Sequence, residues 1–188
     1  DSAFLGIGEN IKQIKEVVAD AAYYSGRTQD DISIMAVTKT VDAARINYAL
    51  SCGIKLIGEN RVQEFVEKRE NLNLSSCDVH LIGHLQSNKV KQIIGKVSMI
   101  QSVDSIKIAK EIGAKSLEIG QTTDILMEIN IQSETNKFGF LPVSAVESAY
   151  ELAQINGVHL CGIMAIPPMN KDEKANRQNF SNINRLFI

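Results

Sequence analysis

Lys39 is the residue of this chain whose type and position indicate chemistry most directly. It follows an apolar run, residues 32–37, that the residue types predict to be a buried strand. A lysine at the mouth of such a strand is expected to be partly desolvated, and desolvation favours the neutral amine that attacks an aldehyde to form a Schiff base. The alternative is a lysine whose stem lies along the strand end while its ammonium reaches water.

Other polar side chains follow the later predicted strands or lie close to their ends. Asn60 could donate its amide N–H to an anionic oxygen, or it could cap the next helix. His84 could be an acid, a base or a ring-stacking neighbour, or a hydrogen-bonded structural imidazole. Glu59 and Glu128 could tune an amine, but their spacing does not make a paired carboxylate set. His159 lies near the start of a strand, at the end opposite to these groups.

Helical and extended patterns alternate along the chain. The apolar runs predicted to form strands are residues 32–37, 54–57, 79–82, 97–103, 124–131 and 158–166. The segments predicted to form helices are residues 7–25, 42–52, 61–71, 86–94, 104–117, 143–155 and 171–188. This alternation predicts an α/β fold with a parallel sheet.

Two architectures fit this order, an open doubly wound sheet and a closed (β/α)8 TIM barrel. A barrel has eight strands and typically about 250 residues. The chain has 188 residues, begins without methionine and ends on an apolar tripeptide. We therefore expect one domain over residues 1–188, a barrel that is incomplete in this chain and shows about six strands. Polar residues collect after the predicted strands, which in a barrel is the face that carries active sites.

Composition narrows the classes of function. The net charge of −2 gives no basic footprint for nucleic acid or membrane. No apolar stretch approaches the roughly 20 residues that span a bilayer. The three cysteines, Cys52, Cys77 and Cys161, include no closely spaced pair. This spacing argues against a disulfide framework and against a zinc site, and it favours a reducing cytoplasm. Neither a glycine-rich dinucleotide fingerprint nor a P-loop motif is present.

Five ordered segments resemble the motifs of the pyridoxal phosphate homeostasis protein family. They are Ala-Val-Thr-Lys-Thr at 36–40, Gly-Glu-Asn-Arg-Val-Gln-Glu at 58–64, His-Leu-Ile-Gly-His-Leu-Gln-Ser-Asn-Lys at 80–89, Lys-Phe-Gly at 137–139 and Gly-Ile-Met-Ala-Ile-Pro at 162–167. These segments extend over nearly the whole chain. The family is similar to the N-terminal barrel of alanine racemase.

The resemblance implies a barrel that holds pyridoxal 5'-phosphate on Lys39 as an internal aldimine. It implies that Asn60 lies near the phenolic oxygen of the cofactor ring and Met164 near the ring itself. We include His84 among the cofactor-binding candidates. The family resemblance implies a carrier that buffers or delivers the cofactor, without secure catalytic activity. The alternative is a racemase-like enzyme, which needs a second acid/base on the opposite face of the ring.

The resemblance also carries expectations about partners and about the end of the chain. Enzymes that depend on pyridoxal phosphate are the expected recipients of the cofactor, and a monomer or weak dimer is the expected assembly. The phosphate-binding segments of the family, one rich in serine and glycine and one similar to Arg-Ile-Gly-Thr, do not occur in these 188 residues. If the chain is truncated, we expect weaker phosphate binding and exposed sheet edges.

Overall fold

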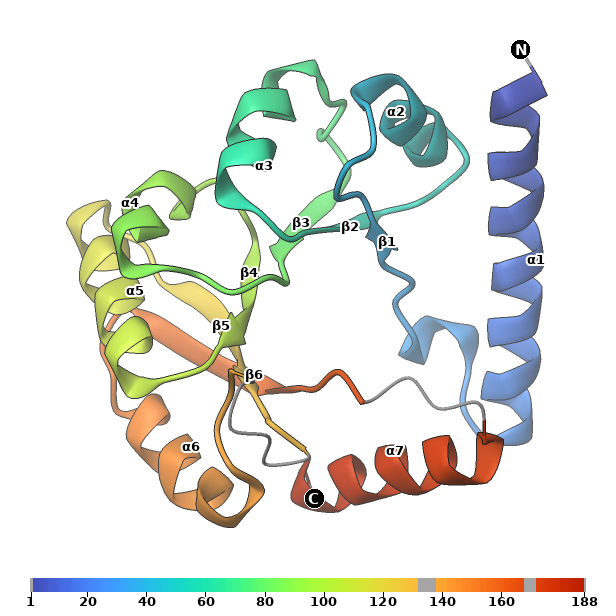
Figure 1. Cartoon of the computed structure of the whole chain (residues 1–188). Coiled ribbons are helices and arrows are strands. Elements are labelled where there is room, and N and C mark those ends of the chain that lie inside the picture. Colours follow the sequence, from blue (N-terminus) through green and yellow to red (C-terminus); the bar gives the residue numbers. More distant parts are fainter. Residues whose placement is uncertain (1, 132–137, 168–171, 188) are drawn as a thin grey trace. The chain divides into compact units, whose positions relative to one another are not determined.

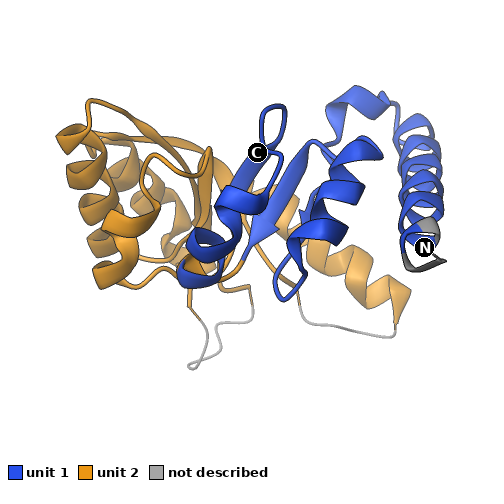
Figure 2. Cartoon of the chain, turned by 90° about the horizontal axis from the view of Figure 1, so that it is seen from above, with its two compact units in different colours: residues 1–59, 63–80 blue, residues 60–62, 81–188 orange. Residues whose placement is uncertain are grey.

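The computed structural model of the chain describes residues 2–131, 138–167 and 172–187. It is an α/β structure in which strands and helices alternate (Figure 1). The described contacts divide the chain into two compact units, residues 1–59 with 63–80 and residues 60–62 with 81–188 (Figure 2). The expectation of one domain over residues 1–188 stays a prediction.

The first unit contains three helices and three short strands. In chain order the elements are α1 (Ser2–Tyr24), η1 (Gln29–Asp31), β1 (Ala36–Val37), α2 (Ala43–Ser51), β2 (Leu56–Glu59), α3 (Val62–Lys68), η2 (Arg69–Asn71) and β3 (Asp78–Leu81), where η denotes a 3-10 helix. Val62 at the start of α3 and Leu81 at the end of β3 belong to the second unit. Strands β1 and β2 are parallel, with Ala36 opposite Ile57 and Val37 opposite Gly58.

The second unit contains the remaining helices and strands. Its elements are η3 (Ser87–Lys89), α4 (Val90–Ile93), β4 (Met99–Val103), α5 (Ile106–Glu118), β5 (Thr123–Glu128), η4 (Pro142–Ser144), α6 (Ala145–Ala153), β6 (Val158–Met164) and α7 (Glu173–Phe187). Strands β4 and β5 are parallel, as are β5 and β6. Alternate residues of β5 are buried, so Ile125 and Met127 lie on its core face and Asp124 and Glu128 lie on the other.

The six predicted strands all form, and the strands follow the order β1-β2-β3-β4-β5-β6 in the sheet. A doubly wound sheet reverses its strand order at a switch point, whereas the strands of a (β/α)8 barrel follow chain order. The order therefore agrees with the prediction of a barrel-type α/β fold that shows six strands. Among the described residues, no helix is both long enough and apolar enough to cross a membrane.

The first strand differs from its prediction. Residues 32–37 were expected to form one buried strand, but β1 contains only Ala36 and Val37, and Val37 is 50% exposed. Residues 32–35 belong to no strand and are only partly buried or exposed. Apolar composition alone predicted this run, and a continuous apolar run does not reveal whether a neighbouring strand pairs with it.

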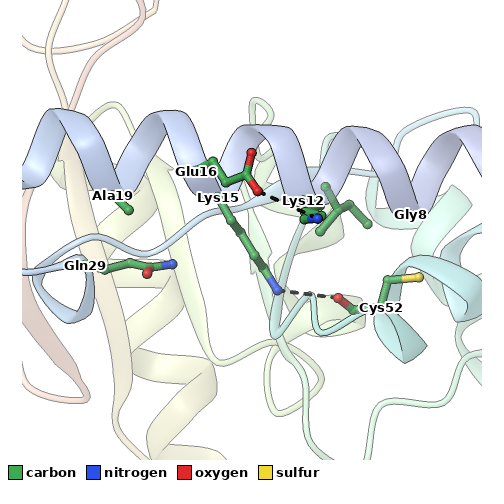
Figure 3. A pocket seen from close by; sticks show the side chains of 8 residues that line it. Gly8, Lys12, Lys15, Glu16, Ala19, Gln29 and Cys52 are labelled. Carbon is green, nitrogen blue, oxygen red and sulfur yellow. Dashed lines mark hydrogen bonds and ion pairs between the residues drawn. The ribbon is translucent and has the colours of Figure 1, made fainter.

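Helix α2 shows how local sequence sets the element ends. The carboxylate of Asp42 accepts the backbone N–H of Arg45 and caps the first turn. Gly53 follows the last turn with φ +85°, the left-handed conformation that glycine adopts without strain. Lys15 of α1 donates through Nζ to the carbonyl oxygen of Cys52 (Figure 3) and to that of Gly53. A cation at the carboxyl end of α2 also complements the helix dipole.

Each unit has its own apolar core. The fully buried side chains of the first unit include Ile46, Ile57 and Phe65. Those of the second unit include Leu81, Ile93, Ile100, Ile112, Ile125 and Leu152. These cores fix the strands, and the polar residues at the strand ends are held by the strands.

Candidate functional site

Lys39 lies in a tight turn directly after β1. The backbone N–H of Val41 donates to the carbonyl oxygen of Thr38 at 3.1 Å, which places Lys39 and Thr40 at the centre of the turn. The Lys39 side chain is exposed. This corrects the expectation of a partly desolvated lysine, because the chain has already left the two-residue strand when it reaches Lys39. The accessible amine can meet a ligand from solvent.

The turn around Lys39 carries backbone strain. Thr40 has φ +61°, and among the described residues it is the non-glycine residue with a positive φ. A β-branched residue in this conformation costs about 1–2 kcal/mol, so the surrounding structure must hold it there. The carboxylate of Glu64 accepts the backbone N–H of Thr40 at 2.6 Å. This contact fixes the strained residue from the side of α3.

Lys68 holds the other side of the same turn. Its ammonium donates to the carbonyl oxygen of Thr38 at 2.9 Å and lies 2.9 Å from Glu64 and 2.8 Å from Glu59. The Lys68 side chain is 13% exposed and that of Glu59 is fully buried. The Thr38 hydroxyl donates to the same Glu59 oxygen, Oε1, while Oε2 is buried without a hydrogen-bond partner. The buried ion pair of Lys68 and Glu59 therefore stabilises the backbone of the turn that contains Lys39.

Asn60 follows β2 and belongs to the second unit, where its backbone touches Gly83. A Cβ atom at Gly83 would lie 2.1 Å from the carbonyl oxygen of Asn60, so only glycine fits there. The hydroxyl of Ser102 donates to the carbonyl oxygen of Gly83 at 2.6 Å. These contacts fix the backbone of Asn60 and of Gly83, and so the points from which the side chains of Asn60 and of the next residue, His84, project. The Asn60 residue is partly buried.

The close approach at Gly83 gives a stability prediction. We expect Gly83→Ala to lower the free energy of unfolding by about 3 kcal/mol, because the clash is with backbone that cannot rotate away. Chemical unfolding followed by circular dichroism measures this change. Gly6→Ala is the matched control, since nothing lies within 4 Å of a Cβ there and alanine favours the interior of α1. Equal stability of the two variants would contradict the prediction.

His84 is both paired and stacked. Its Nδ1 lies 2.8 Å from the Asp104 carboxylate, and its ring stacks on Phe138 with centroids 3.6 Å apart and planes 12° apart. When the imidazole is neutral, donation of the Nδ1 proton to Asp104 leaves Nε2 as an acceptor. The sequence left open whether His84 is an acid, a base, a ring-stacking neighbour or a structural imidazole. In the structure, His84 pairs with Asp104 and stacks on Phe138. Asp104 is used in this pair, while Ser105 caps α5.

Glu128 and Met164 end two neighbouring strands. They are opposite each other in the β5–β6 register, and the backbone N–H of Ile129 donates to the carbonyl oxygen of Met164 at 2.8 Å. Burial raises the pKa of the Glu128 carboxyl, the charge of Asp104 raises it further, and His84 lowers it. Glu128 is therefore a half-buried carboxyl that keeps its proton to higher pH than an exposed glutamate.

The raised pKa of Glu128 predicts a pH-dependent effect of Glu128→Gln. The folded protein binds this proton more tightly than the unfolded chain, so this group lowers wild-type stability as pH rises from 4.5 through its raised pKa. Glutamine cannot ionise, so we expect the variant to gain stability relative to wild type over that window and to keep the gain above it. Urea unfolding from pH 4 to pH 8 measures the difference. A flat profile for Glu128→Gln would refute the prediction.

Of the four predicted cofactor-binding residues, Asn60, His84 and Met164 lie in the second unit and Lys39 lies in the first. That they bind a cofactor together stays a prediction. Lys137 of the fourth resembling segment lies outside the described residues.

Two supporting residues were missed by the sequence reasoning. Lys68 was not singled out, although Glu64 and Lys68 have the i, i+4 spacing of a helical ion pair. No spacing in the sequence connects Asp104 with His84, 20 residues away.

Several known proteins resemble this chain over most of its length. The family model described as alanine racemase, N-terminal domain, matches residues 8–187. The pyridoxal phosphate homeostasis protein of Aquifex aeolicus is 33% identical over 178 residues, which cover 95% of this chain and 78% of that protein. A solved structure of an unknown protein from Bifidobacterium adolescentis is 32% identical with a TM-score of 0.92, covering 99% of this chain and 79% of that one.

A third relative has been solved with its ligand. PipY of Synechococcus elongatus PCC7942, with PLP bound, is 27% identical with a TM-score of 0.73, covering 90% of this chain and 81% of that one. Both the family model and the relatives extend over most of the chain. This chain therefore belongs to the alanine racemase N-terminal domain family and, within it, to the pyridoxal phosphate homeostasis proteins.

Proposed function

We propose that this protein binds pyridoxal 5'-phosphate covalently through Lys39 and buffers or delivers it inside the cell. The observation that carries the proposal is the exposed amine of Lys39 on a turn that Glu64 and Lys68 hold in place. The cofactor supplies an aldehyde, which reacts with primary amines. Membership in the family of pyridoxal phosphate homeostasis proteins supports this assignment, as does the PLP-bound PipY structure.

The residues around the strand ends fit such a ligand chemically. The side-chain amide of Asn60 can donate to a phenolic oxygen, and the flat pair of His84 and Phe138 offers an aromatic surface. Met164 offers a polarisable thioether at the end of β6, and sulfur makes favourable contacts with aromatic rings. We propose Lys39, Asn60, His84 and Met164 as the cofactor-binding residues, with Lys39 as the covalent anchor.

Borohydride reduction followed by peptide mapping tests this proposal. The protein is incubated with pyridoxal 5'-phosphate, reduced, and its intact mass is measured. We expect a gain of one phosphopyridoxyl group, located on the peptide that contains Lys39. An adduct spread over many lysines at the level of free surface amines, or no adduct, would overturn the assignment.

A racemase-like enzyme is the second candidate function. The observation that favours it is the presence of groups able to hold or move a proton, namely the half-buried carboxyl of Glu128 and the His84–Asp104 pair. Racemisation requires proton exchange at the α-carbon of an amino acid, which is visible in heavy water by NMR. We expect no exchange above that of the free cofactor. Faster exchange that Lys39→Ala abolishes would favour the enzyme over the carrier.

The proposal extends to location and partners. We place the protein in the cytoplasm as a monomer or weak dimer, with enzymes that depend on pyridoxal phosphate as recipients. Mixing the loaded protein with an apo-enzyme of this class and following the enzyme's activity tests the transfer. Activity should return faster with loaded wild-type protein than with the Lys39→Ala protein treated in the same way.

A further inference from the structure

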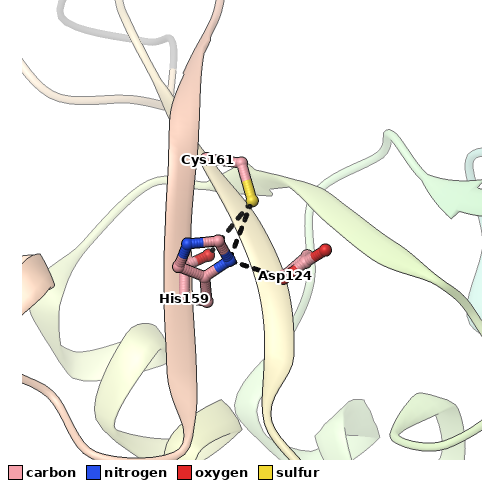
Figure 4. A group of neighbouring side chains, drawn as sticks. All are labelled: Asp124, His159 and Cys161. Carbon is pink, nitrogen blue, oxygen red and sulfur yellow. Dashed lines mark hydrogen bonds and ion pairs between the residues drawn. The ribbon is translucent and has the colours of Figure 1, made fainter.

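A cluster of three metal-binding residue types lies on neighbouring strands of the second unit. Asp124 is on β5, and His159 and Cys161 are on β6 (Figure 4). The parallel register places Asp124 opposite His159, and Cys161 is two residues further along the same strand. Residues two apart on a strand point to the same face, so the three side chains converge. The cluster lies towards the starts of the strands, whereas Glu128 and Met164 lie at their ends.

The donor atoms are already close together. Nδ1 of His159 lies 2.9 Å from a carboxylate oxygen of Asp124 and 3.4 Å from the sulfur of Cys161. All three ligand atoms lie within 4.8 Å of one another. Zinc binds nitrogen, oxygen and sulfur at about 2.0–2.3 Å, which separates tetrahedral donors by about 3.3–3.8 Å. Small side-chain rotations therefore suffice to form three of the four positions of a tetrahedral site.

An irregularity in the sheet helps to present the cysteine. Ile125 is opposite Leu160, but the next residue, Leu126, is opposite Gly162. Cys161 is thus the extra residue of a bulge on β6, without a partner of its own on β5. Bulges redirect side chains and recur next to functional sites. This one places a thiol beside an imidazole and a carboxylate.

We propose that Asp124, His159 and Cys161 form a zinc-binding site whose fourth position is taken by water. Thiolate and imidazole ligands favour zinc over magnesium and calcium, which prefer oxygen alone. The side chains of His159 and Asp124 are 67% and 47% exposed, which gives an ion a path from solvent. The cysteine-spacing argument against zinc considered pairs of cysteines, so it could not detect a set assembled from two strands.

A reactive thiol is the competing interpretation of Cys161. Nδ1 of His159 contacts both the sulfur of Cys161 and a carboxylate oxygen of Asp124, so the thiol is one donor of a converging set. Thiolate, imidazole and carboxylate are the ligand types that zinc takes in proteins. This geometry favours a bound cation over an isolated reactive thiol.

Cobalt titration of the full chain tests the site. The protein is freed of metal, kept reduced, and titrated with Co2+. We expect the visible bands of tetrahedral cobalt with a thiolate-to-cobalt charge-transfer band, and we expect Zn2+ to remove both. Cys161→Ser should abolish the charge-transfer band, and His159→Gln and Asp124→Asn should each weaken binding at least about 10-fold. Cys52→Ser and Cys77→Ser, at free cysteines elsewhere, should change neither readout.

Three results would contradict the zinc site. A wild-type protein without the charge-transfer band, or a band that survives Cys161→Ser, would overturn the zinc site and leave a hydrogen-bonded triad. Unchanged affinity in both His159→Gln and Asp124→Asn would also overturn it. Circular dichroism of each variant, with the borohydride adduct at Lys39 as a second check, confirms that a lost signal is not a lost fold.

Discussion

Replacing Lys39 with alanine is expected to remove the stable covalent adduct with pyridoxal 5'-phosphate, with a loss of at least about 100-fold in the trapped fraction. An amine is required for the link, and alanine has none. Lys39 is exposed in a turn held by Thr38, Thr40, Glu64 and Lys68, so its loss should leave the fold intact. Intact mass after borohydride reduction measures the trapped fraction.

Two control variants separate chemistry from charge. Lys39→Arg keeps the positive charge but replaces the amine by a guanidinium, so it should lose the adduct as alanine does. Lys12→Ala removes another lysine whose side chain is 80% exposed, on α1, and should leave the adduct unchanged. A Lys39→Ala protein that still traps one cofactor per chain in acid-resistant form would show that another residue is the anchor.

The sequence was sufficient to predict the elements and their class. Every predicted strand has a counterpart. The helix predicted at residues 42–52 forms as α2, bounded by Asp42 and Gly53, because capping and left-handed glycine are local effects. The exception is the first strand, which is two residues long instead of six. Strand length depends on the pairing partner, and residues 32–35 have the apolar composition of a strand but belong to none.

The environment of Lys39 could not be predicted in the same way. A lysine next to an apolar run was expected to be desolvated, yet the run ends before it and the turn carries it into solvent. Its support comes from Lys68 and Glu59, which lie 29 and 20 residues further along the chain. Such contacts depend on the tertiary fold. The i, i+4 pair of Glu64 and Lys68 resembles an ordinary surface ion pair, and only the structure shows that it reaches a fully buried glutamate.

This burial predicts that Lys68→Met is among the most destabilising single changes in the first unit. Methionine fills a similar volume but removes the charge, which leaves the buried Glu59 carboxylate with only the neutral Thr38 hydroxyl of the contacts described above. Breaking one side of a buried ion pair costs about 3–5 kcal/mol, because the remaining charge stays desolvated. Urea unfolding measures the loss.

The same substitution should also disturb the anchor, since Thr38 loses a donor to its carbonyl oxygen and the turn is less firmly held. The double variant Glu59→Gln with Lys68→Met removes the stranded charge, so it should recover much of the stability lost by Lys68→Met alone. Lys115→Met breaks an ion pair with Glu118 whose side chains are 38% and 55% exposed, and it should cost less than about 1 kcal/mol. If Lys68→Met and Lys115→Met were equally mild, the Glu59–Lys68 pair would not be the support of the Lys39 turn. If Lys68→Met instead slowed adduct formation while the double variant restored stability but not the rate, the Lys68 ammonium itself, and not merely the neutralised core, would be what positions Lys39.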